Sequence, residues 1–156
     1  DTTILGTGHL LFQLGVHPDQ WELVRSDDAL VGRAVDEALR LEAPVRAFTR
    51  LAVADYDISG TTIPAGDRVL VLYASANRDE RHYADPDRFD VARDARDHVG
   101  FGHGVHRCAG GYLAELEMQS LLRAMAARVR HIEIREPVLA PNNVLRGYRR
   151  FTASFR

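Results

Sequence analysis

The chain has 156 residues, of which 46% are hydrophobic and 27% are charged, a composition typical of a folded globular protein. A net charge of −2 argues against nucleic-acid binding through a basic surface, and apolar runs such as Val69 to Ala74 are too short to span a membrane. The single cysteine excludes an internal disulfide and a four-thiolate metal site, and it fits a reducing cytoplasm.

Three helices are predicted first, over the ranges Thr2 to Leu14, Pro18 to about Arg25, and about Ala29 to Leu41. Gly15 is expected to end the first helix, because glycine is the commonest residue just beyond a helix C-terminus. Pro18 suits the first position of the second helix, and Pro44 ends the third. The third helix carries Glu37 and Arg40 one turn apart on the same face.

Residues 45–72 change to β-strand chemistry, with turns expected at Asp57–Gly60 and Pro64–Gly66 and a strand at Arg68–Leu72. The charged stretch from Asp79 to Gly100 is open to two interpretations, a flexible surface loop or an ordered meander. No internal repeat or linker divides the sequence, so we expect residues 1–156 to form one unit.

The strongest predicted helix spans Ala109 to Val129 and is rich in Ala, Leu, Glu and Arg. Apolar residues recur along it at near-helical spacing and are expected to pack in the core: Leu113, Leu116, Leu121, Met125 and Val129. Strands are expected over Ile132 to Arg135 and Gly147 to Phe155. The predicted fold class is therefore mixed, mainly α with small β-sheets.

The only cysteine lies in a glycine-bracketed turn directly before this last helix, in the stretch Phe101-Gly102-His103-Gly104-Val105-His106-Arg107-Cys108-Ala109-Gly110. Most free cysteines are small buried hydrophobic residues, which is the simplest interpretation of Cys108. However, the N–H groups and dipole at a helix N-terminus stabilise a thiolate, and glycines let the backbone lie flat against a large partner. A thiolate presented in this way is a known ligand of haem iron.

This stretch resembles the haem-binding loop of the cytochrome P450 family, bacterial soluble type. The resemblance implies that residues 1–156 form the C-terminal, haem-thiolate portion of the P450 fold, with Cys108 as iron ligand and haem b as cofactor. It further implies propionate contacts from His106 and from Arg50, within Phe48-Thr49-Arg50-Leu51. The remaining implied cofactor contacts of the loop are Phe101, Gly102, Gly104, Ala109 and Gly110.

Two segments match the family's Glu-x-x-Arg signature, Glu22 to Arg25 and Glu37 to Arg40. The second lies at the interval before the cysteine that bacterial members show, and the first is interpreted as a surface pair. In the family the pair is buried and joined by an arginine from a Pro-x-x-Phe-type segment. Asp85-Pro86-Asp87-Arg88-Phe89 resembles that segment, so Arg88 is the expected third member. We expect Glu37, Arg40 and Arg88 to lock the cysteine loop without taking part in chemistry.

Asp1 and Thr2 resemble the acid–alcohol pair of the family's distal helix, which implies that they guide protons during dioxygen cleavage. The simpler interpretation is that they begin a helix as capping residues. Since this pair lies mid-helix in complete members, the N-terminal part of the protein is expected to be missing, and the fragment alone to be inactive. Two segments resemble substrate-contacting turns, namely Val45-Arg46-Ala47 and Val144-Leu145. Arg46 is expected either to face solvent or to pair a substrate carboxylate.

The resemblance implies a monooxygenase that inserts one oxygen atom of O2 into a small hydrophobic organic substrate. Electrons would come from a ferredoxin or flavoprotein reductase docking near Arg107. Neither a nucleic acid nor a membrane partner is expected. The alternatives are a peroxide-driven haem oxygenase, which would not need Asp1 and Thr2, and a haem-free structural or interaction remnant of the fold. A cysteine nucleophile paired with one of the seven histidines is a further alternative, although no base is evident beside Cys108.

Overall fold

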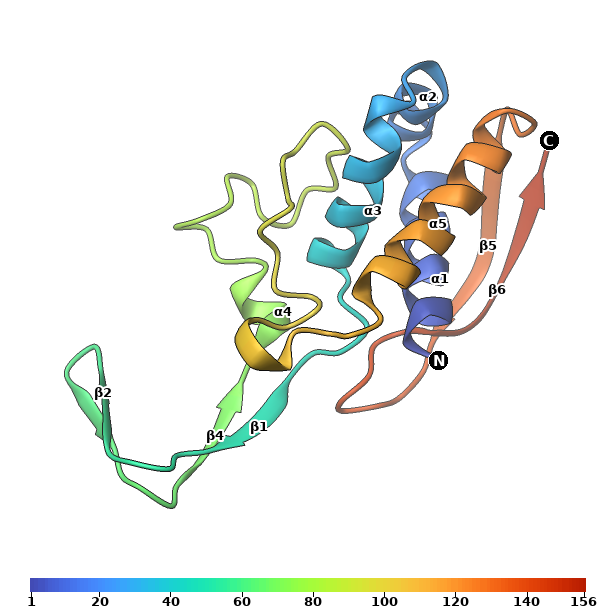
Figure 1. Ribbon diagram of the computed structural model, residues 1–156. Helices are drawn as coiled ribbons and strands as arrows, with labels where there is room; N and C mark the ends of the chain where they lie inside the picture. The colour runs from blue at the N-terminus through green and yellow to red at the C-terminus, as the bar shows by residue number, and fades with distance from the viewer.

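A computed structural model describes all residues, 1–156, and its four longer helices pack together at one end of the molecule (Figure 1). The helices are α1 (Thr2–Val16), α2 (Pro18–Ser26), α3 (Ala29–Leu41), the short α4 (Tyr73–Ala76) and α5 (Gly111–Ala126), with one 3-10 turn at Gly104–His106. The strands are β1 (Phe48–Leu51), β2 (Tyr56–Ile58), β3 (Thr61–Ile63), β4 (Arg68–Val71), β5 (Ile132–Leu139) and β6 (Tyr148–Phe155). None of the helices combines the length and apolar composition that a bilayer span requires.

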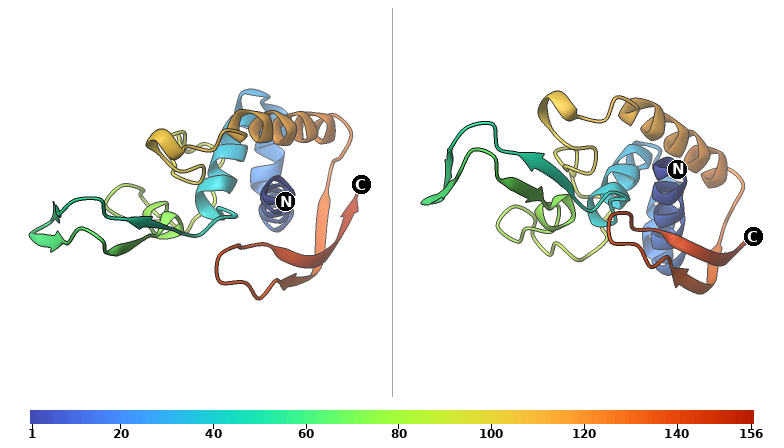
Figure 2. Two further views of the ribbon diagram at one scale, coloured as in Figure 1. Left: turned by 60° about the horizontal axis from the view of Figure 1, so that its bottom comes forward. Right: turned by 90° about the horizontal axis from the view of Figure 1, so that it is seen from below.

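The strands form three separate two-stranded antiparallel sheets, β1 with β4, β2 with β3, and β5 with β6. The first two make an arm that extends away from the helices, whereas the β5–β6 hairpin lies along α1 (Figure 2). The β2–β3 turn is at Ser59 and Gly60, whose φ angles of 49° and 80° fit the left-handed geometry of a two-residue hairpin. The predicted mixture of helices and small sheets is confirmed.

The hydrophobic core joins α1, α2, α3 and α5 to β5 and to the irregular meander that follows α4. Its fully buried members include Leu10, Trp21, Val35, Leu122 and Ile132. The meander contributes Phe89 and Val91 to the core, which fixes its path across α3. Of the two interpretations of residues 79–100, the ordered meander is therefore the one observed.

Gly15 does not end α1, which continues to Val16, and the prediction of a cap there is wrong. A Cβ atom on Gly15 would collide with Cγ1 of Ile134 in β5. The glycine is thus needed where the helix and the hairpin come closest, and its role is close packing rather than capping.

The predicted core stripe of α5 is also largely wrong, because Leu113, Leu116 and Leu121 are 60%, 59% and 40% exposed. The helix buries the side chains of Met118, Leu122 and Met125, of which only Met125 was predicted. Apolar residues occur on more than one face of this helix, so their spacing alone does not select the face that packs against α3.

Candidate functional site

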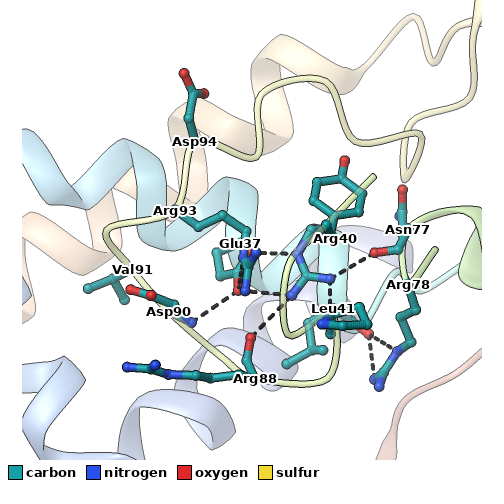
Figure 3. Close-up of polar contacts among 12 residues, drawn as sticks. Glu37, Arg40, Leu41, Asn77, Arg78, Arg88, Asp90, Val91, Arg93 and Asp94 are labelled. Atoms are coloured by element: carbon teal, nitrogen blue, oxygen red, sulfur yellow. Dashed lines mark hydrogen bonds and ion pairs between the residues drawn. The ribbon is translucent and has the colours of Figure 1, made fainter. Parts of the chain in front are cut away.

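Glu37 and Arg40 form a buried ion pair on α3, and both side chains are 0% exposed. The Nε and Nη2 atoms of Arg40 donate to the two carboxylate oxygens of Glu37 at 2.7 and 2.9 Å (Figure 3). The remaining donors reach backbone carbonyls of the meander, those of Asn77 and Pro86 at 2.8 Å and that of Arg88 at 3.3 Å. All five guanidinium N–H groups therefore have an acceptor.

The third charged member of this network is Arg93 rather than Arg88 (Figure 3). The Nε atom of Arg93 lies 3.2 Å from Oε1 of Glu37, and its guanidinium also donates to the carbonyl oxygens of Ala84 and Asp85. The side chain of Arg88 is exposed, because its neighbour Phe89 occupies the inward position, and only its carbonyl accepts from Arg40. We call the set Glu37, Arg40 and Arg93 the meander clamp.

Asn77 connects the meander clamp to the cysteine loop. Its carbonyl accepts from Arg40, and its side-chain Oδ1 accepts from the backbone N–H of Val99 at 2.8 Å. The carbonyl of Val99 accepts from Gly102, and the carbonyl of Phe101 accepts from the N–H of Cys108 at 2.8 Å. A chain of hydrogen bonds thus runs from the ion pair on α3 to the backbone of the cysteine.

Cys108 is exposed and lines an open cavity of about 380 Å³. We call this space the thiol cavity. It is bounded by the start of α1, the end of α3, the segments after α3 and β4, the cysteine loop and α5. Its lining residues are Thr2, Thr3, Leu39, Pro44, Val45, Phe48, Tyr73, Gly100, Phe101, Gly102, His106, Cys108, Gly110, Ala114 and Met118.

Several predicted site residues meet at this cavity, namely Thr2, Val45, His106 and Cys108 together with Phe101, Gly102 and Gly110. Gly102 and Gly104 adopt φ angles of 75° and 67°, in the region that favours glycine, and Gly104 begins the 3-10 turn that carries His106.

Other predicted residues lie outside the cavity lining. Asp1 is exposed at the N-cap of α1 without a side-chain capping bond. Arg50 reaches the cavity only indirectly, since its Nη2 donates to the hydroxyl of Tyr73 at 3.1 Å. Arg46, Ala47 and Val144 line a separate neighbouring groove. Leu145 pairs with Val45 in an isolated β-bridge, and neither Gly104 nor Ala109 is among the lining residues.

Burial next to the loop keeps one histidine neutral. Desolvation, with a smaller contribution from the positive charge of Arg107, lowers the pKa of His98 to about 4. The neutral ring accepts a hydrogen bond at Nδ1 from the N–H of Gly100 at 2.9 Å and packs against Phe101 at 5.6 Å between ring centroids. His98 therefore supports the entry to the cysteine loop as an uncharged acceptor.

Sequence reasoning missed Asn77, Arg93, Phe48 and Tyr73. The charged stretch offered four arginines after Arg78, and nothing in its composition distinguishes Arg93 from the others. Tyr73 follows the predicted strand directly, and an aromatic residue there is the one available signal for the cavity wall.

Comparison with known proteins shows that the family model described as "Cytochrome P450" matches residues 25–142 of the chain. The chain is 43% identical over 148 residues to cytochrome P450 CYP199A2 of Rhodopseudomonas palustris, covering 94% of this chain and 36% of that protein. It is 40% identical over 161 residues to the cytochrome P450 monooxygenase PikC of Streptomyces venezuelae, covering 100% and 39%. The chain thus spans well under half the length of these curated relatives.

Solved structures agree with this similarity. P450BioI, in complex with hexadec-9Z-enoic acid ligated acyl carrier protein, superposes with a TM-score of 0.94 at 35% identity, covering 99% of this chain and 41% of that one. Cytochrome P450-153 from Novosphingobium aromaticivorans gives a TM-score of 0.93 at 38% identity, covering 100% and 40%. The arrangement of helices and small sheets is therefore that of a part of these larger folds.

Proposed function

This chain belongs to the cytochrome P450 family, and from that premise we propose that it is the haem-thiolate part of a monooxygenase acting on a small hydrophobic organic substrate. The observation that carries the proposal is the thiol cavity, because the exposed Cys108 and Thr2, from the start of α1, both line it. A cysteine thiolate that ligates haem iron favours O–O cleavage, and the hydroxyl of Thr2 at the same cavity offers a proton donor for that reaction.

The residues at the cavity fit a haem. Cys108 would supply the thiolate ligand, close to the N-terminus of the 16-residue helix α5, whose dipole favours negative charge. Gly102 and Gly110 leave two positions of the cavity wall without side chains, and Gly110 lies next to the sulfur. His106 offers an imidazole at the rim, and Arg50, held through Tyr73, offers a cation for a propionate. When bound, the haem supplies the oxygen-activating chemistry, and the protein supplies orientation and control of water.

On the substrate side, Thr2 is proposed to hold a proton-donating hydroxyl over the cavity, with Asp1 beside it as the proton source. Val45 and Phe48 provide apolar walls for the substrate. Electrons are proposed to arrive from a ferredoxin or flavoprotein that docks on the exposed cysteine loop, where the guanidinium of Arg107 stacks 5.1 Å from the ring centroid of Tyr112.

The test is the difference spectrum of the reduced, carbon monoxide-treated protein, recorded on the chain together with whatever precedes Asp1 in the native protein. A strongly red-shifted Soret band that disappears in Cys108→Ala supports the proposal. Absence of the band in the unaltered protein would contradict it and leave the haem-free remnant as the better interpretation.

A second measurement separates the monooxygenase from the peroxide-driven alternative. Turnover with a reductase system and O2, with loss of coupling in Thr2→Ala while the carbon monoxide spectrum is retained, is expected for the monooxygenase. Turnover with hydrogen peroxide alone, and no effect of Thr2→Ala, would favour the peroxide-driven enzyme instead.

A further inference from the structure

Two segments about a hundred residues apart form one wall beside the thiol cavity. Val45 pairs with Leu145 in an antiparallel bridge, the N–H of Arg46 donates to Val144 at 3.0 Å, and the N–H of Arg146 donates to Pro44 at 2.8 Å. Val45 itself lines the cavity. We call the paired segments 44–46 and 144–146 the bridge wall.

A buried carboxylate lies behind this wall. Glu42, whose side chain is 8% exposed, follows α3 directly and accepts from both the Nε and the Nη2 of Arg146. The guanidinium of Arg78 approaches the same carboxylate at 3.3 Å from the meander side. Because Arg146 is adjacent to Leu145, its ion pair with Glu42 fixes the backbone of the second segment relative to the first.

Helix α1 joins the same set through a buried histidine. His9 is 1% exposed, and its Nε2 lies 3.1 Å from the carbonyl oxygen of Arg146. A carbonyl only accepts, so Nε2 carries the proton and donates, and Nδ1 is left as a buried acceptor without a partner. Desolvation lowers the pKa of His9, in agreement with a neutral ring.

The set Glu42, Arg146 and His9 lies at a different place in the fold from the meander clamp. Glu37 and its arginines hold the meander and, through Asn77, the cysteine loop. Glu42 and His9 both reach Arg146, so they hold the bridge wall and the first helix together. Glu37 therefore stabilises the loop that carries the thiol, and Glu42 stabilises the bridge wall.

We propose that Glu42, Arg146 and His9 are positioning residues that set the bridge wall and thereby the fit of the substrate in the thiol cavity. The inference rests on the proposed function, since it treats the cavity as the site of a haem and its substrate. Loss of the Glu42–Arg146 pair frees the 144–146 segment to move away from Val45, while the hydrogen bonds that reach Cys108 from the meander clamp stay in place.

The test compares two azole probes on the complete haem-loaded protein. Imidazole and 4-phenylimidazole both bind haem iron through a ring nitrogen, but only the second carries an apolar group that needs the cavity walls. In Glu42→Gln and Arg146→Gln we expect the Kd of 4-phenylimidazole to rise about tenfold, with the Kd of imidazole changed less than about twofold. The matched control is Glu133→Gln, a carboxylate paired with Arg135 on β5 outside the cavity lining, and it should alter neither.

The outcomes separate this inference from the proposed function. If the unaltered protein shows an azole-induced Soret shift but the ratio of the two dissociation constants is unchanged in the variants, the positioning role is overturned and the haem site is retained. If the unaltered protein shows no shift with either azole, the proposed function falls and takes this inference with it.

Arg146→Lys provides an independent variant should loss of charge at Glu42 prevent folding. It keeps the positive charge but loses the two-nitrogen contact with Glu42. An intermediate rise in the Kd of 4-phenylimidazole is expected, and an unchanged Kd for both azoles would overturn the proposal.

Discussion

The meander clamp is connected to the thiol cavity by the hydrogen bonds of Asn77 and the cysteine loop, yet the polar groups of the two regions differ in burial. In the clamp the side chains of Glu37 and Arg40 are 0% exposed and the guanidinium donors are paired with a carboxylate and three carbonyls. At the cavity, Thr2, His106 and Cys108 are all exposed.

The difference separates residues that hold the structure from residues that are available to a bound group. A buried charge is tolerated only when it is fully paired, so removing one partner of the clamp leaves uncompensated charge in the interior. An exposed thiol or hydroxyl has no such dependence on its neighbours. Stability should therefore respond strongly to changes in the clamp and weakly to changes in the exposed polar groups of the cavity, Thr2, His106 and Cys108.

The largest effect is expected from Glu37→Gln, which leaves the guanidinium groups of Arg40 and Arg93 without their carboxylate. We expect a loss of about 3–5 kcal/mol in the free energy of unfolding, measured by urea denaturation. Glu22→Gln is the matched control, since Glu22 is 66% exposed and pairs with Arg25 in the same Glu-x-x-Arg spacing. Its loss should stay below about 1 kcal/mol. Equal losses in the two variants would contradict the distinction between the pairs.

A second comparison tests the assignment within the meander. Arg93→Gln removes a charged contact to Glu37 and two donations to backbone carbonyls, and we expect a loss of about 2 kcal/mol. Arg88→Gln changes an exposed side chain and should alter stability by less than about 0.5 kcal/mol. The same urea measurement decides, and a larger loss for Arg88→Gln would restore the prediction made from the sequence.

The error over Arg88 shows what local sequence can and cannot predict. The helix that carries Glu37 and Arg40 was predicted with its observed bounds, because its apolar spacing and Pro44 are local signals. Which arginine returns to Glu37 depends on the path of an irregular segment, and that path is set by the burial of Phe89 and Val91 rather than by the arginines. The resemblance predicted Arg88, whereas the packing of the meander brings Arg93 to Glu37.

In the candidate site too, local features could be predicted from the sequence and long-range contacts could not. The glycine-bracketed cysteine and its position before a helix are short-range features that single out Cys108, and the resemblance adds His106; both residues line the cavity. The pairing of Val45 with Leu145 joins two segments far apart in the sequence, so no local pattern predicts it. Glu42, Arg146 and His9 offered no short motif at all, which is why the set behind the bridge wall emerged only from the structure.

Asp36 sharpens the comparison, because it is a partly buried carboxylate on α3 that lacks the pairing of its neighbour Glu37. Burial, together with the smaller effects of the nearby charges of Glu115 and Asp94, raises the pKa of Asp36 to about 6 against the opposing effect of Arg96. The pKa in the folded state therefore exceeds the ordinary aspartate value of 3.8. Folding is penalised once the group ionises, so stability is lost as the pH rises from about 4 to about 6.

Asp36→Asn should remove this penalty. We expect the variant to be more stable than the unaltered protein by about 1 kcal/mol above pH 7, a value reduced from the full linkage because the group is only partly buried. The gain should vanish at about pH 2.5, where the carboxyl is protonated in both states. Thermal unfolding across this pH range measures it, and a gain independent of pH would mean that charge is not the cause.

The smallest effect on stability is expected at the residue with the largest expected effect on function. Cys108 is exposed and only its backbone takes part in the hydrogen bonds of the loop, so Cys108→Ala should change the unfolding free energy of the haem-free protein by less than about 0.5 kcal/mol. Under the proposed function, haem bound only to the folded state should add stability to the unaltered protein, and Cys108→Ala should lose that increment together with the red-shifted carbon monoxide band. If the haem-free variant instead lost more than about 2 kcal/mol of unfolding free energy, the thiol would belong to the groups that stabilise the fold. The distinction between the clamp and the exposed groups of the cavity would then not hold for Cys108.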